Sequence, residues 1–202
     1  MDAIVFADVT DPWAYVGATR FERAAATFTI ISGEPVEIVL RAALQDTEVA
    51  PGDAAVLNAR VTAAALKSGI DLNFDDLVPA SSFDAWRLLT WAAESGPTLQ
   101  RDLAHELWRA HFLEGVDIED PFALASRAAL VGLELESAEA LLASGEYADA
   151  VLSQSSAARE IGVRHLPHVV VNATWTLAGI HTQNDYVQAL HRISTGIDPA
   201  VG

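Results

Sequence analysis

The sequence predicts an α/β fold in which one domain is interrupted by a long helical insertion. Short apolar runs near both ends of the 202-residue chain are too short for helices, and almost everything between them has helical periodicity. The predicted order is strand–helix–strand, a helical block, then strand–strand–helix. We therefore place a discontinuous α/β domain at residues 1–52 and 163–202, and a helical insertion domain at residues 53–162.

The first half of the divided domain begins with an apolar run at residues 3–7, which is typical of a buried strand. Pro12 suits the first turn of a helix, which we expect over residues 13–28. Residues 36–40 follow as a second strand. The intervening helix supplies the crossover that parallel pairing of the two strands needs.

The insertion consists of segments whose apolar residues recur at helical spacing, as in the stripe that follows Ser82. Glycines separate the segments. Six helices are predicted, at residues 54–68, 83–94, 99–113, 121–131, 138–143 and 147–161.

The second half of the divided domain returns to strand patterning. The β-branched residues 169–171 predict a strand, and Asn172 and Ala173 predict the turn of a hairpin. Residues 174–177 alternate polar and apolar as the returning strand, and residues 186–193 form a closing helix.

The charge of the chain excludes several classes of partner. Twelve Lys and Arg residues oppose 28 Asp and Glu residues, which gives a net charge of −16. Binding to nucleic acid or to an anionic membrane needs a basic surface, so neither is expected as a partner. The first residues lack the basic region of a signal peptide, and no apolar run reaches the ~20 residues of a membrane helix. We therefore expect a cytoplasmic protein.

Cysteine is absent. Disulfides, thiolate metal sites and cysteine nucleophiles are therefore excluded for this chain.

Several segments together resemble one family. The segment at residues 8–17, D-V-T-D-P-W-A-Y-V-G, resembles the active-site pattern D-x-x-C-P-W-C-Y-x-G of the FrnE-like branch of the DsbA family. Residues 162–167 resemble that family's G-V-x-G-V-P loop, whose proline is cis. Parts of the insertion are similar to the family's helical insert, at residues 57–61, 78–88 and 112–118. The resemblance implies a thioredoxin-like fold (βαβ…ββα) with an inserted all-helical subdomain.

The same resemblance implies thiol–disulfide exchange for typical members, but this chain departs from the pattern at both cysteines. Asp11 and Ala14 stand at those two positions, so we expect the exchange activity to be missing. Two interpretations of Asp11 stay open. It is either a fixed anion at a helix start, where the helix dipole favours negative charge, or a simple N-cap followed by Pro12.

The family's substrate groove supplies the other candidate site residues. In that groove the backbone before the cis-proline pairs with an extended peptide, which points to Leu166, Pro167 and the neighbouring His165. The candidate binding residues on the helix side are Pro12, Trp13 and Tyr15. Trp13 and Tyr15 suit either an aromatic wall for a ligand or core packing. We expect a peptide or a small molecule as the ligand.

Histidines gather in the second half of the divided domain. His165, His168 and His181, together with Asp11, are residue types found in acid/base and metal sites. Their spacing matches no ligand motif, and we predict no metal site.

Two further functions remain as alternatives. The segment at residues 11–15 is similar to the S-P-[FY]-[AS]-Y pattern of 2-hydroxychromene-2-carboxylate isomerases and kappa-class glutathione transferases, except that Asp11 replaces the serine. That resemblance implies a cysteine-independent isomerase or transferase that uses glutathione; otherwise no cofactor is expected. The last alternative is an interaction protein whose acidic insertion binds a basic partner. A homodimer is compatible with every alternative.

Overall fold

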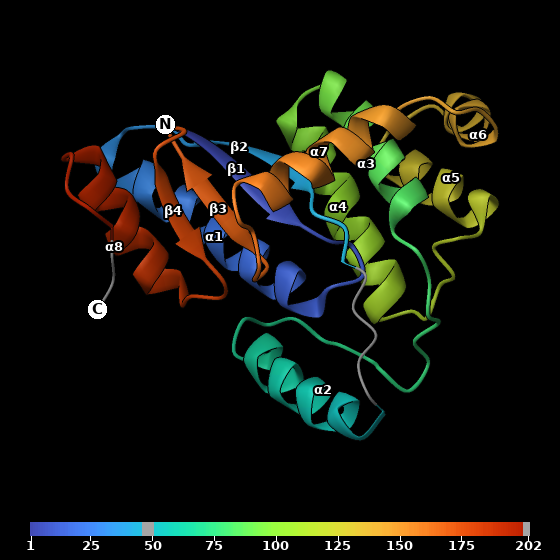
Figure 1. The fold of residues 1–202 in the computed structure, drawn as a ribbon, viewed down its shortest axis with the longest axis horizontal. Helices are drawn as coiled ribbons and strands as arrows, with labels where there is room; N and C mark the ends of the chain where they lie inside the picture. Colours follow the sequence, from blue (N-terminus) through green and yellow to red (C-terminus); the bar gives the residue numbers. More distant parts are fainter. Residues whose placement is uncertain (46–50, 200–202) are drawn as a thin grey trace.

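The computed structural model describes residues 1–45 and 51–199, with the side chains of residues 51–53 left aside. A four-stranded sheet in the order β2-β1-β3-β4 forms its centre (Figure 1). The strands are β1 (Asp2–Ala7), β2 (Glu37–Ala42), β3 (His168–Val171) and β4 (Trp175–Ala178). β1 pairs in parallel with β2 and antiparallel with β3, which in turn pairs antiparallel with β4. The two ends of the chain therefore build one sheet, as predicted.

Two helices belong to this sheet. Helix α1 (Pro12–Ser32) is the crossover between β1 and β2, and α8 (Gln183–Ser194) packs beside it. The buried rings of Phe21 and Tyr186 meet edge to face between the two helices, with 5.3 Å between their centroids. The fold class is confirmed as α/β and thioredoxin-like, with a helical insertion between β2 and β3.

Five helices of the insertion pack together and against the sheet. They are α3 (Phe83–Glu94), α4 (Pro97–Phe112), α5 (Pro121–Leu130), α6 (Leu135–Ala143) and α7 (Ala148–Glu160). Helices α3, α4 and α7 contact β2, and one core runs from the strands into these helices. The insertion therefore extends the core of the sheet, although the sequence indicated a subdomain of its own.

Side chains of the insertion satisfy the outer edge of β2. Gln100 of α4 accepts a hydrogen bond from Leu40 N at 2.9 Å and donates one to Leu40 O at 3.0 Å. Gln154 of α7 accepts a hydrogen bond from Ala42 N at 2.9 Å. An edge strand exposes main-chain groups that invite pairing with other chains. Here side chains of α4 and α7 form hydrogen bonds with these main-chain groups, which a neighbouring strand would otherwise do.

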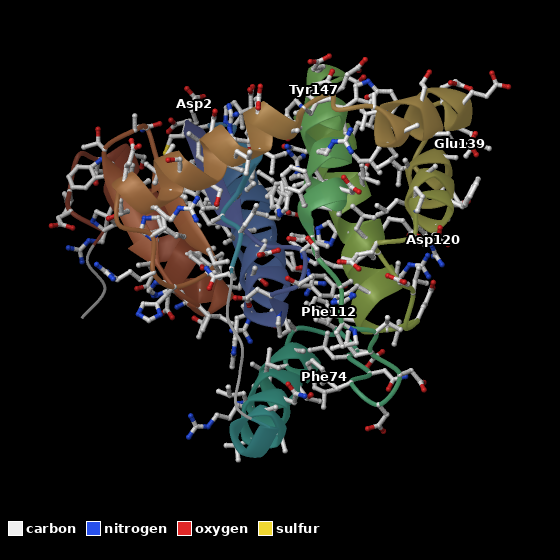
Figure 2. All side chains as sticks on the ribbon, turned by 45° about the vertical axis from the view of Figure 1, so that its right-hand side comes forward. Asp2, Phe74, Phe112, Asp120, Glu139 and Tyr147 are labelled. Carbon is white, nitrogen blue, oxygen red and sulfur yellow. The ribbon has the colours of Figure 1, made fainter. Side chains whose placement is uncertain are left out.

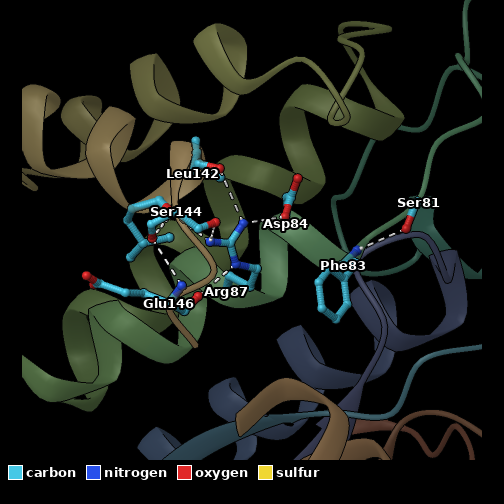
Figure 3. A network of polar contacts seen from close by, with 8 residues as sticks. Ser81, Phe83, Asp84, Arg87, Leu142, Ser144 and Glu146 are labelled. Carbon is cyan, nitrogen blue, oxygen red and sulfur yellow. Dashed lines mark hydrogen bonds and ion pairs between the residues drawn. The ribbon is translucent and has the colours of Figure 1, made fainter. Parts of the chain in front are cut away.

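Arg87 joins α3 to the segment between α6 and α7 (Figure 3). This buried side chain of α3 donates to the main-chain oxygens of Leu141 at 2.6 Å, Ser144 at 2.7 Å and Glu146 at 2.8 Å. It also forms an ion pair with Asp84 at 2.8 Å. One guanidinium therefore binds the segment between α6 and α7 to α3, and its charge is compensated where it is buried.

The remaining helix of the insertion, α2 (Pro51–Leu66), lies apart from the other five (Figure 1). Its Val61 and Ala65 pack on Val16 of α1 in a small second core. Arg20 of α1 donates to Ala64 O at 2.7 Å, near the carboxyl end of α2. Helix α2 is therefore attached to α1 rather than to the rest of the insertion.

The loop after α2 returns to the end of α4. Asn73 N donates to Phe112 O at 2.7 Å, and the rings of Phe74 and Phe112 meet edge to face (Figure 2). The loop that follows α2 is therefore fixed to the end of α4.

Local capping explains where the helix boundaries differ from those predicted. Helix α1 continues to Ser32 because Gly33, at φ 74°, supplies the left-handed residue that ends it. Helix α6 begins at Leu135 because the Glu134 side chain accepts hydrogen bonds from the first turn. Helix α8 begins at Gln183, after a capping box at Thr182. In the part of the chain that is described, no helix is long and apolar enough to cross a membrane.

Gly17 allows α1 to approach the loop before β3. A Cβ atom at this position would overlap the ring of Pro167, far inside van der Waals contact. We predict that Gly17→Ala lowers the free energy of unfolding by about 1–3 kcal/mol through overpacking. Urea unfolding measures the change, with Gly145→Ala as the control because a Cβ there meets nothing within 4 Å. Equal stability of the two variants would contradict the close contact.

Candidate functional site

A cavity of about 840 Å³ lies where the two halves of the divided domain meet helix α2. Residues 10–13 at the start of α1 form one wall, and residues 164–166 with Gly179 and Ile180 form the second. Helix α2 supplies the third wall. A concave, mostly apolar site with a few polar groups is the usual form of a small-ligand site.

Asp11 occupies the N-cap of α1 and borders the cavity. Its Oδ1 accepts hydrogen bonds from Trp13 N at 2.7 Å and Ala14 N at 3.1 Å. Within the described chain, Oδ2 has no hydrogen-bond partner. One oxygen therefore caps the helix, and the other is available to a ligand.

Burial raises the pKa of Asp11 to about 6 from an ordinary value of 3.8. The N–H groups of Ala14 and Trp13 favour the anion and lower the pKa, but desolvation outweighs them, and the nearby Asp8 carboxylate raises the pKa further. Asp11 therefore changes charge close to neutral pH. Perturbed carboxyls of this kind are frequent at functional sites.

Asp8 shapes the loop between β1 and α1. Its buried carboxylate accepts hydrogen bonds from Thr10 N and Oγ1, both at 3.2 Å, and from Gln45 N at 2.7 Å. Asp8 thereby ties the end of β1 to the chain that follows β2. The sequence motif contained this residue, but no role was predicted for it.

The other candidate residues at the start of α1 separate into two groups. Pro12 and Trp13 border the cavity, whereas Ala14 is fully buried in the core. The ring of Tyr15 lies against α4, stacked on Trp108 with 5.1 Å between centroids and an interplanar angle of 19°. Of the two aromatic residues, Trp13 faces the cavity and Tyr15 packs on the helical insertion.

The Leu166–Pro167 peptide bond is cis. Leu166 borders the cavity, and Pro167 is buried against Gly17 of α1. Gly179 N donates to Pro167 O at 2.9 Å, but among the described residues nothing is hydrogen-bonded to the main-chain N–H or C=O of Leu166. This donor and acceptor at the cavity wall are available to an extended ligand.

The three histidines do not converge. His165 is exposed and borders the cavity. His168 is buried in β3, where neither ring nitrogen has a hydrogen-bond partner and burial lowers the pKa of the imidazole. His181 lies before α8, with its ring against Tyr186 and Nε2 at 3.2 Å from Ala178 O. Over residues 1–45 and 51–199, no three His, Asp or Glu side chains are arranged to hold a metal ion.

Sequence reasoning missed an entire wall of the site. Helix α2 contributes Leu57, Asn58 and Val61, and the turn before β3 contributes Arg164. The only signal in the sequence was the resemblance of residues 57–61 to a family insert, which carries no information about where α2 packs.

Comparison with known proteins places this site in a family. The DSBA-like thioredoxin domain matches residues 3–191, which is nearly the whole chain. The chain belongs to the DsbA-like thioredoxin family. This DsbA-like protein contains no cysteine, and the placement of Asp11 and Ala14 at the family's cysteine positions stays a prediction from the resemblance. The comparison with curated proteins found no match.

Solved structures of similar proteins carry several activities. A probable DsbA oxidoreductase from Streptomyces coelicolor is 25% identical with a TM-score of 0.85, over 100% of this chain and 93% of that one. The cytosolic disulfide reductase DsbM from Pseudomonas aeruginosa, solved with GSH, is 19% identical with a TM-score of 0.68, over 98% and 100%. A 2-hydroxychromene-2-carboxylate isomerase is 16% identical with a TM-score of 0.66, over 97% and 94%. The last two likenesses show a shared fold.

The raised pKa of Asp11 predicts a pH-dependent cost in stability. The folded state binds this proton more tightly than the unfolded state, so the cost is absent below pH 3.8, grows as the pH rises to about 6 and is complete above it. We expect Asp11→Asn, which keeps a good N-cap, to be more stable than the wild type by about 2 kcal/mol at pH 7.5. The gain should disappear at pH 3.5. Denaturant unfolding at the two pH values measures it; an equal gain at both would exclude this origin.

Restoring both cysteines tests the assignment of positions 11 and 14. We expect Asp11→Cys with Ala14→Cys to gain insulin-reducing activity in the presence of dithiothreitol, whereas the wild type has none. The N–H groups that now bind Asp11 would stabilise the attacking thiolate. Ala14→Cys alone is the control, since one buried thiol cannot complete the exchange. A folded double variant without activity would show that these positions are not aligned for it.

Proposed function

We propose that this protein is a ligand-binding member of the DsbA-like family that has lost thiol–disulfide exchange. It would bind an extended peptide, or a small molecule of similar shape, in the cavity beside Leu166 and Asp11. The absence of cysteine supports the loss of exchange, because a mixed disulfide requires a thiolate.

The single observation that carries the proposal is the free main chain of Leu166 at the cavity wall. A buried N–H and C=O without partners cost free energy, which a ligand main chain would recover by pairing with them. Leu166 is itself 5% exposed, so its surroundings already exclude most water. The cavity beside it is large enough for several residues of a peptide.

The walls of the cavity suit an amphipathic ligand. Trp13 and Leu57 offer apolar surface on two different sides, and Asp11 offers one free carboxylate oxygen between them and the Leu166 loop. The carboxylate takes the place of the sulfur anion of other family members, but it orients a donor instead of attacking a bond. The site therefore retains binding without the covalent step.

Binding is tested with cysteine-free peptides of alternating apolar and polar residues. We expect Leu57→Trp to weaken peptide affinity at least about tenfold, because the larger side chain fills the cavity. Leu152→Trp is the matched control, since Leu152 is also partly exposed but lies on α7, outside the cavity. Isothermal titration calorimetry measures both variants, with a peptide N-methylated at one main-chain nitrogen as a second probe. The methylated peptide should bind more weakly because it lacks the donor for Leu166 O.

Three results would contradict the proposal. They are a lack of affinity for every peptide, equal affinities in the two tryptophan variants, or turnover of a dithiol substrate by the wild type. Strong thermal stabilisation by millimolar glutathione, without peptide binding, would instead favour the alternative of a glutathione-using isomerase or transferase.

A further inference from the structure

We propose that the preferred occupant of this cavity is an amphipathic carboxylate, an apolar body with one anionic end held by Arg164. This inference rests on the proposed function, since it names the ligand class of the same site. It adds a recognition element that the family motif does not contain.

Arg164 is the first observation. This exposed residue borders the cavity, and in the described part of the chain its guanidinium forms no ion pair or hydrogen bond. The chain carries 28 acidic residues against 12 basic ones. Other arginines of the site region are engaged: Arg20 binds Ala64 O, and Arg23 binds Ser68 O. A cation that borders a cavity of a strongly acidic protein, and that has no partner among the described residues, is suited to an anionic ligand.

The second observation is how the two charges of the cavity are separated. Asp11 also borders the cavity, yet it forms no ion pair with Arg164, and the charge that acts on it is that of Asp8. Because the two groups form no ion pair, the wall of the cavity carries a cation at Arg164 and a separate carboxylate at Asp11. A carboxylate would be attracted to Arg164 and repelled from Asp11, which fixes the direction in which a ligand binds.

The apolar lining of the cavity indicates that the rest of the ligand is apolar. Trp13 lies at the start of α1, Val61 and Leu57 on α2, and Ile180 after β4, so apolar side chains come from three elements. Leu57 is 38% exposed. An aryl or alkyl body would cover this surface, whereas a fully polar anion such as acetate would not.

The test uses three probes that share one apolar body: 4-phenylbutyrate, its neutral amide and the corresponding amine. At pH 7.5 and low ionic strength, calorimetry should show the carboxylate binding more tightly than the neutral amide, with the amine as the probe of opposite charge that Asp11 attracts. Arg164→Gln should weaken the carboxylate roughly tenfold and leave the amide unchanged. Arg159→Gln is the matched control, because it removes the same charge from an exposed position on α7 outside the cavity.

Asp11→Asn is the opposing variant. It removes the negative charge of the carboxylate and should tighten 4-phenylbutyrate at least about twofold, without an effect on the amide. Equal affinities for the carboxylate and the amide, or equal affinities in the Arg164 and Arg159 variants, would overturn the inference. If peptides bind but 4-phenylbutyrate does not, the inference fails and the proposed function stands. If no probe of either series binds, the proposed function fails as well.

Discussion

One stripe along helix α1 positions every wall of the cavity. Trp13, Val16, Gly17 and Arg20 follow the spacing i, i+3, i+4, i+7, so they share one face of the helix. Trp13 forms part of the wall itself, Val16 packs on α2, and Gly17 admits the ring of Pro167. Arg20 binds the carboxyl end of α2 and also His181 O, at 3.2 Å, in the segment after β4. Helix α2, the loop with Pro167 and the segment with His181 are far apart in the sequence, yet all three contact the same two turns of α1.

The role of Asp11 is clearest beside another carboxylate cap in the same chain. Glu134 caps α6 with the same kind of bonds to main-chain N–H groups, and because it is fully exposed these bonds lower the pKa of its carboxyl. At Asp11 burial reverses the outcome and the pKa rises. A cap alone would be more stable at the surface. Asp11 is buried beside the cavity, where one carboxylate oxygen caps α1 and the other makes no hydrogen bond within the described chain.

The fold could be predicted from hydrophobic periodicity, helix caps and the family resemblance, whereas only part of the candidate site could be predicted. Helix α3 was predicted at its observed bounds because Ser82 and a regular apolar stripe mark it locally. Trp13 borders the cavity and Tyr15 packs on α4, because residues two apart on a helix point in nearly opposite directions. No role was predicted for the histidines, and the structure separates them: His168 lies within β3, and His181 follows β4. The wall formed by α2 depends on long-range packing of Val61 on Val16, for which one sequence has no signal.

The helices of the insertion pack in two separate places: α3, α4 and α7 contact β2, whereas α2 packs on α1. Helices α4 and α7 occupy the edge of β2 with amide side chains, which stabilises the sheet and removes a surface for pairing with other chains. Helix α2 takes no part in that edge; it packs on α1 through Val61 and Ala65 and leaves Leu57 partly exposed. A segment needed only for stability would bury that side chain. Leu57 shares the cavity wall with Arg164 and Leu166. Among the described residues, neither Arg164 nor the main chain of Leu166 has a hydrogen-bond partner. This arrangement is consistent with the proposal that a ligand supplies the missing contacts.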